Sequence, residues 1–349
     1  MPANSPLRLP PIEATRDPAL QARLQQKIDL KTKPQGALGR LEPLALQLGM
    51  IQRSESIVLQ SPQMVVFAAD HGIASEGVSA FPQAVTVQMV GNMLAGGAAV
   101  NVFARQHGFG LHVVDAGVAA DLADHPRLLQ KKIARGTANS CEAPAMTLAQ
   151  AQAALEAGMA VVQGLPGNVI AFGEMGIANT SCAALLLSRL AGLPLGDVVG
   201  RGTGLDDGQL AHKQAVLERA LARHADASGV LPVLAAMGGF EIAMMSGAIL
   251  QAASERRIVM IDGFIAGAAA LVAHALAPQA KDCFVFCHRS AERGHHLLLA
   301  HLGARPLLDL DMRLGEGTGA LLAWPLLQSA ALFMAEMASF DSAGVSTKN

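Results

Sequence analysis

Short apolar runs alternate with longer Ala-rich segments through the middle of the chain. Each run stops at a Gly, Asp or His residue, and the segments between the runs are long enough to be helices. Uninterrupted apolar strands separated by helices are typical of a parallel sheet that is covered on both faces. We therefore predict an α/β fold, a Rossmann-like parallel sheet flanked by helices. The predicted strands are residues 64–69, 111–114, 169–172, 258–261 and 283–287.

The two ends of the chain differ in pattern from the middle. Residues 1–61 are amphipathic with helical spacing, and the sequence becomes helical again after about residue 305. No repeat and no low-complexity linker separates these regions, so we expect a second unit built from both termini. The prediction is a large α/β domain of residues 62–305 and a small helical domain of residues 1–61 plus 306–349 that completes the site.

Composition narrows the class of protein. The 349 residues are 51% hydrophobic and 15% charged, so the chain buries much of its surface in its own core or against a second copy. A net charge of -2, without a basic cluster, and 3% aromatic residues without tyrosine argue against a nucleic-acid surface. Apolar stretches such as residues 263–272 are read as too short for a bilayer, which takes ~20 residues. Without a secretory signal at the start, we expect a cytoplasmic protein with no membrane contact.

Four cysteines, Cys141, Cys182, Cys283 and Cys287, lie in apolar or Gly- and Ala-rich surroundings. In a cytoplasmic chain they are expected to be reduced thiols. Cys283, Cys287 and His288 can also be read as metal ligands, but no second pair of ligands follows at zinc spacing. We therefore predict buried core cysteines and no metal or other cofactor.

Glu316 is the strongest candidate for chemistry, because it stands alone among small residues in the segment 314–319. Glycines on both sides remove the Cβ atoms that would hold a substrate ring away from the carboxylate. A carboxylate presented in this way can act as a base on a bound molecule. The alternative is a turn with a solvated glutamate, and this segment alone does not decide between the two.

Two glycine-rich segments are candidates for phosphate binding. Residues 172–181 are predicted as a strand, a glycine turn and a helix whose exposed amides suit a phosphate. Residues 200–207 are predicted to follow another strand, with an acidic cap and a helix that carries Lys213. Neither segment has the P-loop spacing, and no dinucleotide fingerprint follows the first strand. An ordinary helix cap remains the alternative for residues 172–181.

Three further polar residues interrupt apolar segments. Asp70 and His71 follow the first predicted strand, and a hydrogen bond that fixes the loop is favoured over catalysis there. Glu241 lies inside an apolar segment and needs a partner, because an unpaired buried charge is unfavourable.

A base with two phosphate loops indicates a transfer reaction at a carbon of a sugar phosphate.

Five short segments occur in a specific order along the chain. They are residues 33–42 (Lys-Pro-Gln-Gly-Ala-Leu-Gly-Arg-Leu-Glu), 69–72 (Ala-Asp-His-Gly), 173–180 (Gly-Glu-Met-Gly-Ile-Ala-Asn-Thr), 238–241 (Gly-Gly-Phe-Glu) and 313–319 (Arg-Leu-Gly-Glu-Gly-Thr-Gly). Each segment is modest evidence alone, but together, in this order, they closely resemble the nicotinate-nucleotide:dimethylbenzimidazole phosphoribosyltransferase family, from about Pro18 to Phe340. The family transfers phosphoribose from nicotinate mononucleotide to 5,6-dimethylbenzimidazole, giving α-ribazole 5′-phosphate and nicotinate in cobalamin biosynthesis.

The resemblance implies a role for each candidate residue. Glu316 would be the general base that takes a proton from one ring nitrogen while the other attacks the anomeric carbon, inverting β to α. Glu174 would be a second carboxylate close to the nucleotide. The residues implied to bind the nucleotide and its phosphate are Glu174, Gly176, Asn179, Gly202, Gly204 and Lys213. Those implied to bind the base are Phe81, Gln88, Met89 and Leu314.

The resemblance also implies a homodimer, and it leaves two other functions to exclude. Some relatives carry Ser where this chain has Phe81 before Pro82. A nucleotide-dependent oxidoreductase would fit the sheet and glycine loops, but the dinucleotide fingerprint is missing. A catalytically silent binding protein is disfavoured by the intact Glu316.

Overall fold

A six-stranded parallel sheet forms the centre of the computed structural model, which describes residues 7–202 and 204–346. The strand order is β3-β2-β1-β4-β5-β6, and every pairing is parallel. The central strands are buried along their length because helices cover both faces. The strands are β1 (Gln63–Ala69), β2 (Gly110–Gly117), β3 (Leu128–Gln130), β4 (Val169–Met175), β5 (Ile258–Ile261) and β6 (Phe284–Phe286).

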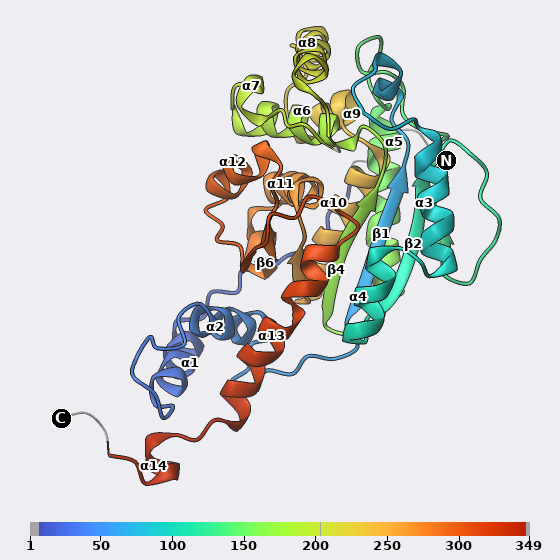
Figure 1. Cartoon of the computed structure of the whole chain (residues 1–349). Helices are drawn as coiled ribbons and strands as arrows, with labels where there is room; N and C mark the ends of the chain where they lie inside the picture. The colour runs from blue at the N-terminus through green and yellow to red at the C-terminus, as the bar shows by residue number, and fades with distance from the viewer. Residues whose placement is uncertain (1–6, 203, 347–349) are drawn as a thin grey trace.

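The strand order reverses at β1, which divides the helices between the two faces of the sheet. The chain leaves β1 through α3 (Ala84–Ala95) and α4 (Ala99–His107) to reach β2 on one side. It later leaves β4 and β5 in the opposite direction to reach β6. Because such crossovers are right-handed, α3 and α4 cover one face, whereas α5 (Leu148–Gln163) and α10 (Phe240–Ser254) cover the other (Figure 1). The crevice between β1 and β4 at their carboxyl ends is therefore the expected ligand site.

Shorter elements surround the carboxyl edge of the sheet. A two-stranded parallel sheet joins β7 (His288–Arg289) to β8 (Leu308–Asp309). The helices α6 to α9 lie together above the carboxyl ends of the strands in Figure 1. The remaining elements are η1 (Gly72–Glu76), α6 (Asn179–Ala191), α7 (Leu195–Val198), α8 (Asp207–Arg223), α9 (Val230–Met237), α11 (Phe264–Leu276), η2 (Pro278–Cys283) and α12 (Arg293–His301).

Helices from the two ends of the chain gather beside the sheet. The long α13 (Thr318–Glu336) starts at the carboxyl edge and runs to α1 (Pro18–Asp29) and α2 (Leu41–Gln52), with α14 (Phe340–Ala343) beyond them (Figure 1). A buried ion pair joins Lys33 Nζ to Glu42 Oε1 at 2.8 Å, and Lys31 Nζ donates to the Met334 carbonyl at 2.9 Å. This arrangement suits a small helical unit made from both termini, although the proposed domain division itself stays a prediction.

The α/β prediction is confirmed, and two details differ. The short strands β3, β7 and β8 were not predicted, because two or three residues carry no readable alternation. The apolar stretches were expected to be too short to cross a membrane. That expectation was wrong for α13, which is long and apolar enough by length and composition alone. The stretch Ala84–His107 passes the same test, but glycines 96 and 97 divide it into α3 and α4. About half of α13 is buried inside the molecule, which accounts for its apolar character.

Candidate active site

A cavity of about 310 Å³ lies at the carboxyl edge of the sheet, beside the point where the strand order reverses. Its wall is made by the end of β4 and the start of α6, by residues 262–266 after β5, by α3 with the residue run before it, and by residues 313–316. These segments are far apart in sequence. The parallel sheet brings them together because all of its strands end at the same edge.

Glu316 occupies a strained turn immediately before α13. Its φ is 61°, a left-handed conformation that residues with a Cβ rarely adopt, and Gly315 and Gly317 on either side have φ of 85° and 83°. A Cβ on Gly173 of β4 would overlap the backbone of Glu316, so only glycine there allows this approach. The Glu316 side chain is at the cavity wall, and the residue is 5% exposed.

The first turn of α4 holds one oxygen of the Glu316 carboxylate. Val100 donates its backbone N–H to Glu316 Oε2 at 3.1 Å. Burial raises the pKa of Glu316, the backbone amides of Val100 and Ala99 oppose that shift, and the charge of Asp262 adds to it. The carboxylate is therefore held in one orientation and is a stronger base than an exposed glutamate.

Glu174 places a second carboxylate in the same wall, 7% exposed. The Asn179 side-chain amide donates to Glu174 Oε2. Burial is the main cause that raises the pKa of Glu174 to about 8, and the charges of Glu241 and Asp262 add to it. At neutral pH this carboxyl is therefore largely protonated, whereas its ordinary pKa would leave it ionised.

A recess of about 40 Å³ beside the main cavity gathers the predicted phosphate-binding residues. Gly176, Asn179, Gly202 and Lys213 all line it. Lys213 is 1% exposed, and its Nζ donates to Thr180 Oγ1 at 2.8 Å and to the Gly200 carbonyl at 3.2 Å. Burial lowers the pKa of Lys213 to about 8. The recess therefore offers a cation and a glycine-rich backbone to a small anion.

The two glycine-rich segments differ in detail from the prediction. The helix after β4 begins at Asn179, and its N-cap is Ala178, which has φ 75°. The Asn179 side chain does not cap the helix, because it donates a hydrogen bond to Glu174. The second segment follows the short helix α7, not a strand. The predicted acidic cap is confirmed, since Asp206 accepts from the Gln209 amide at the start of α8. Gly204 lines a neighbouring cavity, and Thr203 lies outside the described residues.

An apolar wall closes the other side of the main cavity. Phe81, Met89 and Leu314 line it as predicted, and Val85 joins them. Phe81 and Leu314 are 48% and 58% exposed, so they stand at the mouth. Gln88 is exposed on α3 and is not at the cavity wall. Residues four apart on a helix share a face, so Val85 and Met89 point inward while Gln88 does not.

The pair at the end of β1 takes the structural role that the sequence favoured. His71 Nε2 lies 2.8 Å from Glu241 Oε1, and both residues are fully buried. Burial would lower the pKa of His71, but Glu241 and Cys182 together raise it well above its ordinary value. Glu241 thus has the partner that a buried carboxylate requires. Asp70 accepts from the Ala119 amide at 2.8 Å and holds the loop after β2.

Several wall residues were not assigned a role from the sequence. Asp262 follows β5 directly, a position that signals an edge residue in a parallel sheet. The others lie in the first turn of α11, in the short strand β7 or in irregular segments, where the sequence gives no comparable signal. They are Ile265, His288, Ser290, Glu292 and Arg313. The described residues contain no group of three or more His, Cys, Asp or Glu that could hold a metal ion.

Comparison with known proteins gives consistent matches. A family model described as phosphoribosyltransferase matches residues 14–345. The nicotinate-nucleotide–dimethylbenzimidazole phosphoribosyltransferase of Cupriavidus necator is 62% identical over 336 residues, 95% of this chain and 96% of the relative. The Variovorax paradoxus protein of the same name is 58% identical over 341 residues, 98% of each chain. A crystal structure of the Thermus thermophilus protein of that name superposes with a TM-score of 0.91 at 44% identity, covering 95% of this chain and 100% of the other.

Proposed function

This chain belongs to the nicotinate-nucleotide–dimethylbenzimidazole phosphoribosyltransferase family, and on that premise we propose that Glu316 is the general base of its transfer reaction. The proposed donor is nicotinate mononucleotide and the proposed acceptor is 5,6-dimethylbenzimidazole. The observation that supports this proposal is the position of the Glu316 carboxylate. It is buried, it is oriented by the Val100 amide of α4, and it lies in the wall of a cavity that also has an apolar side. The recess that contains Lys213 lies beside this cavity. Each part of that wall suits one part of the two substrates.

The proposed chemistry balances without a cofactor. One ring nitrogen of the benzimidazole forms a bond to the anomeric carbon of ribose. The bond from that carbon to the pyridinium nitrogen breaks, and its electron pair neutralises the leaving nicotinate ring. The proton on the second benzimidazole nitrogen passes to the Glu316 carboxylate. No general acid is needed, because the leaving nitrogen departs neutral.

Inversion at the anomeric carbon is the stereochemical outcome that we propose. In a single displacement the attacking nitrogen arrives opposite the departing one, which converts a β linkage to an α linkage. Such a displacement needs the two rings on opposite sides of the ribose. The apolar wall at Phe81, Val85 and Met89 suits the benzimidazole, and the recess at Lys213 fixes the phosphate end of the donor.

Glu174 and Asn179 are proposed to bind the donor near its ribose. A carboxyl with a pKa of about 8 can donate as well as accept a hydrogen bond at neutral pH. Together with the Asn179 amide it suits sugar hydroxyls, which also do both. The proposed phosphate contacts are the recess residues Gly176, Gly202 and Lys213. The role of Gln88 in binding the base and that of Gly204 in binding the nucleotide stay predictions.

We further propose a cytoplasmic homodimer in which the small helical unit completes the site of the other copy. The main cavity is lined by residues 313–316 but by none of the described residues of 1–61. Its mouth exposes Phe81 and Leu314. In Figure 1, α1 and α2 lie beside α13, away from the carboxyl ends of the strands. Completion by residues 1–61 therefore requires a second copy. The four free cysteines fit a reducing compartment.

A two-substrate assay tests the proposed reaction. Purified protein is incubated with nicotinate mononucleotide and 5,6-dimethylbenzimidazole, and nicotinate and ribazole phosphate are measured by chromatography. We expect both products, in equal amounts, only when both substrates are present. Nicotinate without ribazole phosphate would indicate a hydrolase, and nucleotide binding with no product would indicate a silent binding protein.

A further inference from the structure

Helix α13 begins without a capping side chain of its own. Its N-cap is Gly317, which has φ 83° and no side chain to accept from the first-turn amides. A capping side chain at this position would be strained at this φ and would have to displace the end of the Met64 side chain. The amides at the start of a helix are unsatisfied unless a group from elsewhere accepts from them. This helix start follows directly after Glu316.

Asp262 supplies the missing cap from another part of the sheet. It follows β5, and its Oδ2 accepts from the Gly317 N–H at 3.2 Å while its Oδ1 accepts from the Ala320 N–H at 3.0 Å. Ala320 is the third residue of α13, the position that a capping side chain normally satisfies. Both carboxylate oxygens are thus engaged with the turn that carries Glu316.

The turn needs such support, because Glu316 has a left-handed conformation that is unfavourable for a residue with a Cβ. Conformations of this kind persist only where surrounding contacts fix them. The Val100 amide fixes the side chain of Glu316, whereas Asp262 fixes the backbone directly after it. These two contacts come from α4 and from the end of β5, and they hold different atoms.

We propose that Asp262 is a positioning residue for the transfer reaction, because it holds the Gly317 and Ala320 amides and thereby fixes the Glu316 turn. The inference rests on the proposed role of Glu316 as the base. Asp262 acts through backbone hydrogen bonds and through its charge. The same carboxylate lies 3.5 Å from His288 Nε2, and its charge adds to the rise that burial causes in the pKa of both Glu174 and Glu316.

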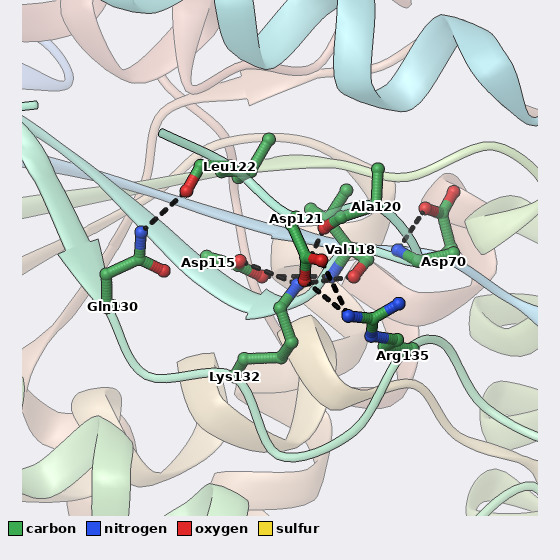
Figure 2. Close-up of polar contacts among 10 residues, drawn as sticks. Asp70, Asp115, Val118, Ala120, Asp121, Leu122, Gln130, Lys132 and Arg135 are labelled. Atoms are coloured by element: carbon green, nitrogen blue, oxygen red, sulfur yellow. Dashed lines mark hydrogen bonds and ion pairs between the residues drawn. The ribbon is translucent and has the colours of Figure 1, made fainter. Parts of the chain in front are cut away.

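Asp115 offers a matched control within the same sheet. It lies at the end of β2, is fully buried, and accepts the Val118 N–H at 2.9 Å (Figure 2). Lys132 Nζ lies 2.7 Å from its other oxygen. Asp115 therefore holds a backbone amide, as Asp262 does, but it is not among the residues that line the cavity. Loss of either carboxylate is expected to lower the melting temperature.

The kinetic test compares Asp262→Asn with Asp115→Asn. For Asp262→Asn we expect kcat to fall at least about tenfold, with nucleotide affinity within about twofold of the parent. The acid limb of its pH–rate profile should move to lower pH, because a negative charge beside Glu316 is removed. Asp115→Asn should keep kcat within about twofold and leave the acid limb in place. Equal losses in both variants, or an unchanged Asp262→Asn, would overturn the inference.

A double mutant shows whether Asp262 acts through Glu316. In a Glu316→Gln background, Asp262→Asn should change the residual single-turnover rate less than about twofold. A further tenfold loss would mean that Asp262 has an independent role and would refute positioning. Asp262→Glu keeps the charge and both acceptor oxygens, so it should return the acid limb to the parent position. If it leaves the limb displaced, the charge of Asp262 does not act on Glu316.

Amide hydrogen exchange separates this inference from the proposed reaction, because it needs no substrate. Exchange in residues 313–322 should be at least several-fold faster in Asp262→Asn than in the parent, with Asp115→Asn unchanged there. Unchanged exchange would overturn the positioning role whatever the reaction is. A parent protein that forms no ribazole phosphate, with faster exchange in the variant, would instead refute the proposed reaction alone.

Discussion

At the scale of single residues, the site combines groups whose surroundings shift their protonation in defined directions. Burial raises the pKa of Glu316 and of Glu174 and lowers that of Lys213. A proton acceptor, a carboxyl that is largely protonated at neutral pH, and a cation close to its titration range therefore share one small volume. Such shifted groups in a cavity are typical of active sites.

The pH dependence of turnover follows from Glu316. The base must be ionised to take the proton, and its pKa is raised by burial, so kcat should fall on the acid side at a higher pH than the usual range of glutamate. The check is kcat measured from about pH 5 to 8 with saturating substrates. A rate that stays flat down to about pH 4 would contradict a buried glutamate base.

Glu174 makes a separate prediction about stability. A carboxyl whose folded-state pKa is raised stabilises the fold at low pH, and that contribution is lost as the pH rises from about 4.5 through about 8. Glu174→Gln removes the ionisation, so its melting temperature relative to the parent should be higher at pH 9 than at pH 6. Glu336→Gln, on an exposed part of α13, is the control and should follow the parent. Parallel curves for Glu174→Gln and the parent would count against the raised pKa.

Some of these residues could be found in the sequence and others could not. Glu316 was identifiable because glycines flank it, and Lys213 because a glycine-rich segment and an acidic cap precede it. Asp262 signals only a strand end, since the amides that it accepts from are more than fifty residues away. Gln88 was placed by resemblance, but one residue along a helix turns the side chain to a different face.

At the scale of elements, the recess depends on two helices meeting. The start of α6 brings Thr180 and Asn179, and α8 brings Lys213 from the opposite side. Replacing Lys213 by Ala should weaken nicotinate mononucleotide binding about 10- to 100-fold, because a charge-assisted hydrogen bond is lost. Calorimetry of nucleotide binding is the check, with the exposed Lys131→Ala as control. Parent-like affinity would remove Lys213 from the phosphate site.

Elements with long apolar runs could be predicted from the sequence, whereas short elements could not. The strands β1, β2, β4, β5 and β6 all appear where the apolar runs stood. A strand before the second glycine-rich segment was expected, but residues 195–198 form one helical turn. Four residues in either state look alike in sequence, because periodicity needs a longer window.

At the scale of the whole molecule, the high apolar content has two explanations that act together. The sheet core and the buried part of α13 account for much of it. Exposed apolar side chains remain, among them Leu30, Phe81, Leu314 and Leu332. Their spread over both the cavity mouth and the terminal helices could not be predicted from the sequence, because exposure depends on the tertiary fold.

Sedimentation velocity tests the proposed dimer. We expect a species of twice the 36.1 kDa chain mass at micromolar concentration. Removing α1 and α2 by a truncation would disturb the fold, so a charge at Leu332 on the exposed side of α13 is the milder probe. Leu332→Glu should shift the protein towards monomer and lower turnover. A monomeric parent with full activity would contradict completion of the site by a second copy.

The most direct test of the central claim is the single-turnover rate of Glu316→Gln with nicotinate mononucleotide and 5,6-dimethylbenzimidazole. The substitution keeps the shape of the side chain and removes its ability to accept the proton. We predict a rate at least about 100-fold below the parent, with nucleotide affinity within about twofold. A variant that transfers phosphoribose at close to the parent rate would show that Glu316 is not the base.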